Sequence, residues 1–135
     1  MHLLRTIIVA LLAAVTCGSL AQAAELQMYR RVGCPYCAAW DRDVGPIYGK
    51  TDIGRRIPLR MIDLDRESPA VTLKTPIIYT PTFVLVEDGR EIGRIQGYPG
   101  DSFFWGLLDR LVEQLSSGLP DGQGASVRIV ATAGF

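Results

Sequence analysis

Apolar residues follow a strand pattern in four stretches of the chain. Thr82–Glu87 is the clearest, because its residues are largely apolar and β-branched. Asp88-Gly89 comes next and is a typical two-residue hairpin turn, so Glu91–Gln96 is predicted to return as an antiparallel partner. Leu26–Tyr29 is a short strand candidate. Leu59–Leu64 alternates only weakly, which predicts a strand buried on both faces.

Two further stretches have helical spacing. The first begins at Pro35, and Gly45-Pro46 is expected to break or kink it, because proline has no backbone N–H to donate to the preceding turn. Its apolar stripe consists of Cys37, Trp40, Val44 and Ile47. The last helix is capped by Asp101 or Ser102, and its apolar face consists of Phe104, Leu107, Leu108, Leu111 and Leu115.

Between these elements, residues 48–56 are expected to form a loose helical turn and a loop, and residues 65–80 show little periodicity. The order strand, helix, strand, loop, hairpin, helix predicts an α/β sandwich. We expect a mixed sheet with helices covering both faces.

The N-terminal residues have the pattern of a secretory signal peptide. Arg5 precedes an apolar run over residues 6–15, and Ala21-Gln22-Ala23 has the small residues of a cleavage site. The apolar run is shorter than the ~20 residues of a membrane-spanning helix, which disfavours an uncleaved anchor. We therefore expect residues 1–23 to be removed after about Ala23, and the mature protein to be exported to the periplasm.

The rest of the chain is predicted to contain one folded domain, residues 24–115. Residues 116–135 are rich in Ser, Gly, Pro and Gln, which predicts a disordered C-terminal tail. The formal net charge is zero and no basic stripe stands out, so nucleic acid is not an expected partner. No other stretch has the length of a membrane span.

Two cysteines lie outside the signal peptide, in the motif Cys34-Pro35-Tyr36-Cys37; the third, Cys17, lies within it. The single histidine, His2, also lies in the signal peptide. Two cysteines supply half of the four Cys/His ligands that a structural zinc site uses, so no metal is expected. Without an imidazole, nucleophilic catalysis of the Cys–His or Ser–His kind is excluded.

The C-x-x-C spacing at a strand-to-helix junction indicates reversible dithiol–disulfide exchange. At the helix N-terminus the Cys34 sulfur faces unpaired backbone N–H groups and the positive end of the helix dipole, which favour its thiolate. We expect Cys34 to be the nucleophile and Cys37, one turn further, to resolve the mixed disulfide by forming the Cys34–Cys37 disulfide. The alternative is an inert structural disulfide. Neither requires a cofactor, and none is expected.

The motif, together with Tyr79–Phe83 and Asp88-Gly89, resembles the thioredoxin superfamily. The resemblance implies a thioredoxin-like fold, a central mixed β-sheet flanked by helices, with a cis-proline next to the C-x-x-C. Thr80-Pro81 matches that cis-proline dipeptide. The resemblance also implies that Thr80 and Pro81 bind substrate, with the Thr80 backbone pairing with an extended segment, and that Pro35 and Tyr36 contact the substrate from the motif itself.

The chain departs from relatives of this superfamily at two places. The stretch after the hairpin, residues 97–101, lacks the Gly-Gly platform with which glutaredoxins bind glutathione. Met28 stands where cytosolic thioredoxins have a buried aspartate that helps to deprotonate the second cysteine. Glu25, Arg30 and Asp63 remain as candidate proton-handling groups for Cys37, although each is also a typical solvated strand-end residue.

Gly33–Asp41, Gly45-Pro46, Thr80–Val86 and Gly97–Leu108 are similar to SoxS-type periplasmic thioredoxins of bacterial sulfur-oxidation (Sox) systems. That resemblance implies a dithiol reductant for a cysteine of a periplasmic protein, namely the SoxYZ sulfur carrier. We also expect the protein to be a monomer. It also implies a membrane thiol-reductant conduit as electron donor. Two alternatives stay open: a disulfide oxidase or isomerase, and a non-catalytic thioredoxin-like binding module.

Overall fold

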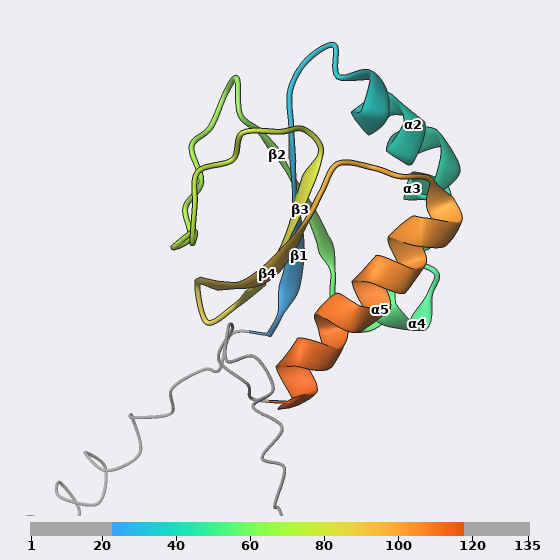
Figure 1. Ribbon diagram of the computed structural model, residues 1–135, viewed down its shortest axis with the longest axis vertical. Coiled ribbons are helices and arrows are strands. Elements are labelled where there is room, and N and C mark those ends of the chain that lie inside the picture. The colour runs from blue at the N-terminus through green and yellow to red at the C-terminus, as the bar shows by residue number, and fades with distance from the viewer. Residues whose placement is uncertain (1–22, 118–135) are drawn as a thin grey trace, which may run out of the picture.

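A four-stranded mixed sheet forms the centre of the protein. The computed structural model describes residues 23–117, so residues 1–22 of the expected signal peptide and residues 118–135 of the expected tail lie outside the described part. The strands are β1 (Glu25–Arg30), β2 (Leu59–Asp63), β3 (Thr82–Glu87) and β4 (Arg90–Gln96), in the spatial order β2-β1-β3-β4. The helices are α2 (Pro35–Asp43), α3 (Gly45–Tyr48), α4 (Asp52–Arg56) and α5 (Asp101–Ser117) (Figure 1).

The strand pairings explain how the chain brings its motifs together. β1 pairs with β2 in parallel, which requires the crossover through α2, α3 and α4. β1 pairs with β3 antiparallel, and β3 turns into β4 at Asp88 and Gly89, with φ of 49° and 73°. Positive φ at both residues is the requirement of a type I′ hairpin turn, so the predicted hairpin is confirmed.

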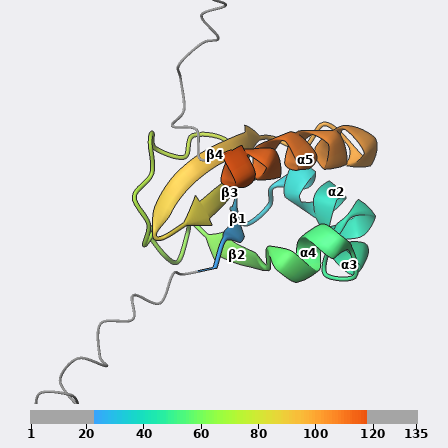
Figure 2. The same ribbon diagram turned by 90° about the horizontal axis from the view of Figure 1, so that it is seen from below.

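All of the described helices pack on one face of the sheet, contrary to the expected cover on both faces. Leu26 and Phe83 face the helices and share a buried cluster with residues of α2 and α5. Tyr29 and Val84 point the other way, where the segment between β2 and β3 covers them (Figures 1 and 2). That segment, residues 64–81, supplies apolar cover without a helix, because Pro69 and Pro76 interrupt it and no helical stripe runs through it.

Trp40 is the centre of the core between the sheet and the helices. It is fully buried, and its ring lies 5.5 Å from that of Phe83 and 5.8 Å from that of Phe104, centroid to centroid. Tyr48 of α3 completes the cluster at 6.2 Å. Aromatic pairs at these separations add about 0.5–1.5 kcal/mol each beyond their buried area. The core thus joins α2, α3, α5 and β3, and the predicted place of Trp40 on the apolar stripe of the first helix is confirmed.

The predictions for β2 and for the end of the first helix were wrong. β2 was expected to be buried on both faces, yet Arg60 and Met61 are exposed, because β2 is an edge strand of the described sheet. Ile47 was expected to continue the stripe of the first helix, yet it is 45% exposed. The break at Gly45-Pro46 starts a new helix, α3, in which Tyr48 is buried in the core and Ile47 is not.

The last helix ends two residues beyond the expected domain boundary at 115, because α5 continues through Ser117. On its predicted apolar face Phe104, Leu108 and Leu111 are buried, whereas Leu107 is exposed. None of the helices in residues 23–117 is long and apolar enough to cross a membrane.

Gly54 allows α4 to pack against the end of α3. The backbone N–H of Gly54 donates to Thr51 Oγ1, the cap of α4, and a Cβ at position 54 would lie 1.9 Å from the Tyr48 carbonyl oxygen. We predict that Gly54→Ala destabilises the protein by about 3 kcal/mol, because the backbone must move apart. The measurement is the denaturant midpoint of the oxidised protein.

Gly106→Ala in α5 is the matched control. Gly106 is exposed in mid-helix, and a Cβ there would meet no described atom within 4 Å. This change should stabilise the protein by up to ~1 kcal/mol through helix propensity. Equal effects of the two substitutions would contradict the close approach at Gly54.

Candidate active site at the start of helix α2

The junction between β1 and α2 places Cys34 at the N-cap of the helix. Gly33 has a φ of +76°, a left-handed conformation that glycine adopts without a steric cost, and it turns the chain from the strand into the helix. Cys34 is extended, with φ −73° and ψ 110°, and Pro35 occupies the first helical position. Proline suits that position, because its missing N–H would have no partner within the helix.

Cys34 and Cys37 form a disulfide, with their Cα atoms 5.3 Å apart. The Cys34 sulfur also accepts the backbone N–H of Cys37 at 3.1 Å, so a sulfur takes the place of the usual capping oxygen. Cys37 is fully buried in the main core, whereas Cys34 is half-buried and borders solvent. A sulfur atom that approaches from outside therefore meets Cys34.

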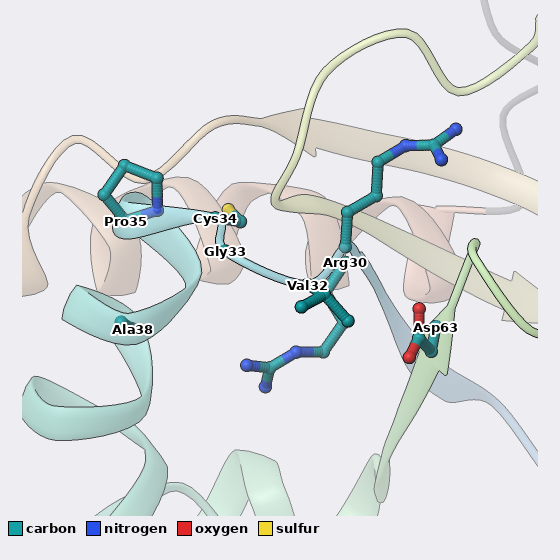
Figure 3. Close-up of a pocket in the computed structure, with 8 residues that line it drawn as sticks. Arg30, Val32, Gly33, Cys34, Pro35, Ala38 and Asp63 are labelled. Carbon is teal, nitrogen blue, oxygen red and sulfur yellow. The ribbon is translucent and has the colours of Figure 1, made fainter.

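A pocket of about 440 Å³ opens beside Cys34 (Figure 3). Its walls come from the end of β1, the turn that follows, the first turns of α2 and the end of β2. The residues that line it are Arg30, Arg31, Val32, Gly33, Cys34, Pro35, Ala38 and Asp63. Figure 3 shows Asp63 on β2 across the pocket from Pro35 and Ala38 on α2.

Arg30 joins the end of β1 to α2. Its Nη1 and Nη2 donate to the two carboxylate oxygens of Asp41, at 2.9 and 2.7 Å. The hydrogen bond with Asp41 raises the pKa of Arg30 above its ordinary value, against the opposing effect of burial. A bidentate pair of this kind fixes orientation as well as distance. It therefore helps to set the angle at which α2 presents Cys34.

Asp65, just after β2, fixes the turn that precedes Cys34. One carboxylate oxygen accepts the backbone N–H of Val32 at 3.0 Å, and the other accepts Arg31 Nη1 at 2.6 Å. The hydrogen bond from Val32 and then that from Arg31 lower the pKa of Asp65. The turn thus has a charged anchor although its side chains are exposed.

The other predicted substrate-binding residues come from two elements, the first turn of α2 and the approach to β3. Pro35 and Tyr36 are exposed in the first turn of α2, and Tyr36 is 62% exposed. Thr80 and Pro81 precede β3, which starts opposite Tyr29, near the point where β1 leaves for Cys34. The Thr80–Pro81 peptide bond is cis, Thr80 is half-buried and Pro81 is buried.

The three candidate proton-handling residues lie in different places. Glu25 is at the end of β1 far from the motif, and Arg30 forms an ion pair with Asp41. Asp63 lines the pocket that also contains Cys34, but its carboxylate accepts the backbone N–H of Asp65 at 3.0 Å. Met28, fully buried, lies in the same apolar cluster as Cys37.

Sequence reasoning missed the ion pairs that orient the site. Nothing in the hydrophobic pattern pairs Arg30 with Asp41 or Arg31 with Asp65, because these partners are far apart in the chain and lie at strand and helix ends. The one available signal was the position of Asp63 and Asp65 at the carboxyl end of β2, which parallel pairing brings beside the end of β1.

A disulfide closed over the first turn of a helix, on a mixed four-stranded sheet, defines a thioredoxin-like thiol–disulfide oxidoreductase. The periplasmic thioredoxin SoxS from Paracoccus pantotrophus, in its reduced form, is 43% identical; the match covers 68% of this chain and 98% of that one, with a TM-score of 0.64. This chain belongs to the thioredoxin family, in the group that includes SoxS.

A thioredoxin from Malassezia sympodialis, Mala s 13, shares the fold at 20% identity and a TM-score of 0.51, over 70% of this chain and 76% of that one. No protein-family model and no curated protein matches the chain.

The anchoring of the turn by Asp65 gives a pH-dependent prediction. Because the folded pKa is depressed, the stabilising contribution of the Asp65 carboxylate is complete above its ordinary pKa of about 4 and is lost as the pH falls through the lower folded value. In an NMR titration the Val32 amide proton should therefore shift with a midpoint below ~3.9. Asp65→Asn should abolish that titration. A midpoint at or above the ordinary value would contradict the two bonds.

Proposed function

We propose that this thiol–disulfide oxidoreductase acts in the periplasm as a monomeric dithiol reductant of a cysteine in a partner protein. The observation that carries the proposal is the unequal exposure of the two cysteines. Cys34 borders solvent at a helix N-terminus, whereas Cys37 is enclosed by the core. This asymmetry matches the separate roles of an attacking and a resolving thiol, and an inert disulfide has no need of it.

The proposed reaction has two exchange steps. In the reduced protein the Cys34 thiolate, stabilised by the N-terminus of α2, attacks one sulfur of a substrate disulfide; the other sulfur leaves as a thiolate and is protonated. The Cys37 thiolate then attacks the Cys34 sulfur of the mixed disulfide, and the bound substrate sulfur leaves as a second thiol. Two electrons and two protons pass to the substrate, and the Cys34–Cys37 disulfide forms.

Substrate recognition in this proposal involves both sides of Cys34. Pro35 and Tyr36 offer exposed apolar contact from the helix. Thr80 and Pro81 approach from the start of β3, where the Thr80 backbone would pair with an extended substrate segment by strand addition. A protein with a disulfide or a modified thiol on an accessible strand suits such a site better than a small thiol does.

The proposed partner is the cysteine of a SoxYZ-type sulfur carrier, and the proposed electron donor is a membrane thiol-reductant conduit. Both come from the resemblance to SoxS-type thioredoxins, which the 43% identity to a periplasmic SoxS thioredoxin supports. An oxidising compartment supports the reductive direction, because there a disulfide is the resting state unless reducing equivalents are delivered.

Removing each cysteine separates the two roles. We predict that Cys37→Ser accumulates a mixed disulfide with an oxidised protein substrate, because no resolving thiol remains. Cys34→Ser should form no such adduct and should lower turnover by roughly a thousandfold or more. Non-reducing electrophoresis and mass spectrometry identify the adduct and its attachment site. Trapping through position 37 in the Cys34→Ser variant would reverse the assignment.

The direction of the reaction is tested by the reduction potential. We expect a value within ~−180 to −270 mV, the range of isomerases and thioredoxins, measured by equilibration with glutathione or dithiothreitol buffers. A value near ~−120 mV, together with faster oxidation of a reduced substrate than reduction of an oxidised one, would support the disulfide-introducing alternative. Efficient reshuffling of scrambled disulfides at an intermediate potential would support the isomerase alternative.

A further inference from the structure

A buried ion pair on β4 contacts the segment that connects β2 to β3. Arg94 donates to both carboxylate oxygens of Glu91, each at 2.6 Å, and the two side chains are only 11% and 1% exposed. Burial would raise the pKa of Glu91, but the hydrogen bonds from Arg94 and from the Lys74 amide lower its pKa overall. Both charged side chains are therefore buried with hydrogen-bond partners. Burying such a pair would cost free energy if its hydrogen bonds were incomplete.

The guanidinium of Arg94 has a second set of bonds, to the connecting segment itself. Its Nη2 donates to the Thr75 carbonyl at 2.8 Å, and its Nη1 lies 3.4 Å from the Pro76 carbonyl. Glu91 accepts the Lys74 backbone N–H at 2.8 Å. Three successive residues of the segment, 74 to 76, are therefore bonded to one ion pair on the adjacent edge strand.

These anchored residues lead directly to the proposed substrate-binding dipeptide. Ile77 packs into the smaller core of that face of the sheet, and Ile78 and Tyr79 are then 74% and 63% exposed. At the far end Thr82 Oγ1 donates to the Tyr79 carbonyl at 2.7 Å, and the Pro81 carbonyl accepts the Gly97 N–H at 2.7 Å. The exposed turn is thus fixed on both sides.

Bonds to backbone carbonyls fix where a segment lies without restricting which side chains it presents. Outside these anchors the segment has little regular structure, only an isolated bridge between Thr72 and Arg90. Loss of the Arg94 bonds would release the Thr75 and Pro76 carbonyls, and Ile77 alone separates Pro76 from the exposed Ile78. The ion pair is therefore placed to control the position of residues 78–81.

We infer that Arg94, oriented by Glu91, is a positioning residue that sets the substrate-binding turn 78–81 relative to Cys34. The inference rests on the proposed function, because it assigns that turn to the recognition of a protein substrate. It requires no contact between Arg94 and the substrate. A protein disulfide, which must pair with the turn, depends on the position of the turn, whereas a small disulfide reaches the Cys34 thiolate without it.

The test compares two substrates and a matched pair of arginines. Arg94→Lys retains a positive charge for Glu91 but lacks the fork that reaches Thr75 and Pro76 as well. Arg55→Lys is the control, because Arg55 forms an i,i+3 ion pair with Asp52 on exposed α4. Insulin serves as the protein disulfide, with dithiothreitol as reductant, and 5,5′-dithiobis(2-nitrobenzoate) as the small disulfide.

For Arg94→Lys we expect kcat/KM for insulin to fall roughly tenfold, mainly through KM, while the rate with the small disulfide stays within about twofold. Arg55→Lys should change neither rate. Equal losses with both substrates, or no loss with insulin, would overturn the inference. Failure of the wild-type protein itself to reduce insulin, with the small disulfide still reduced, would instead count against the proposed function.

A second variant and a second measurement keep the inference testable if Arg94→Lys does not fold or if the activity assays give no signal. The double variant Glu91→Gln/Arg94→Met removes both charges, so that no carboxylate is left buried without a partner. In either variant, amide hydrogen exchange at Gly97, whose N–H donates to the Pro81 carbonyl, should become faster, while the amides of α2 keep their wild-type protection. Unchanged exchange at Gly97 would overturn the positioning role whatever the activities are.

Discussion

The burial of Trp40 is the constraint on which the site depends. α2 is short, and a helix of this length has little stability of its own in water. Its indole packs against Phe83 from the sheet, Phe104 from α5 and Tyr48 from α3, so one side chain fixes the helix to three other elements. The indole Nε1 is buried without a hydrogen-bond partner among the described residues, and the aromatic packing must offset that cost.

With α2 fixed in this way, Cys34 is fixed too, because it is the N-cap residue of that helix. The bidentate bond between Arg30 and Asp41 adds orientation from the strand side, and Asp65 fixes the turn between strand and helix. These charged contacts lie next to the half-buried Cys34 in the chain, while Cys37 is fully buried in the main apolar cluster. The two cysteines of one motif therefore have opposite environments, one polar and accessible and the other apolar and enclosed.

Much of this was predictable from local sequence, because local chemistry decides it. The cap position of Cys34, the hairpin at Asp88 and the break before α3 each depend on residues next to one another in the chain. The edge position of β2 and the single helical layer depend on which elements exist elsewhere in the fold, and no local pattern encodes that. The partners Arg30–Asp41 and Glu91–Arg94 were missed because charged residues have no periodic signal.

The Glu91–Arg94 pair also affects how the molecule behaves in the presence of other copies of itself. β4 is the last strand of the described sheet, and an edge strand offers backbone groups that a second chain can pair with. Here two charged side chains turn inward from that edge, and the register between β3 and β4 shifts at Leu85 and Val86. Inward charges and an irregular edge both disfavour edge-to-edge pairing of sheets, so the strand that holds residues 74–76 in place is also a poor template for aggregation.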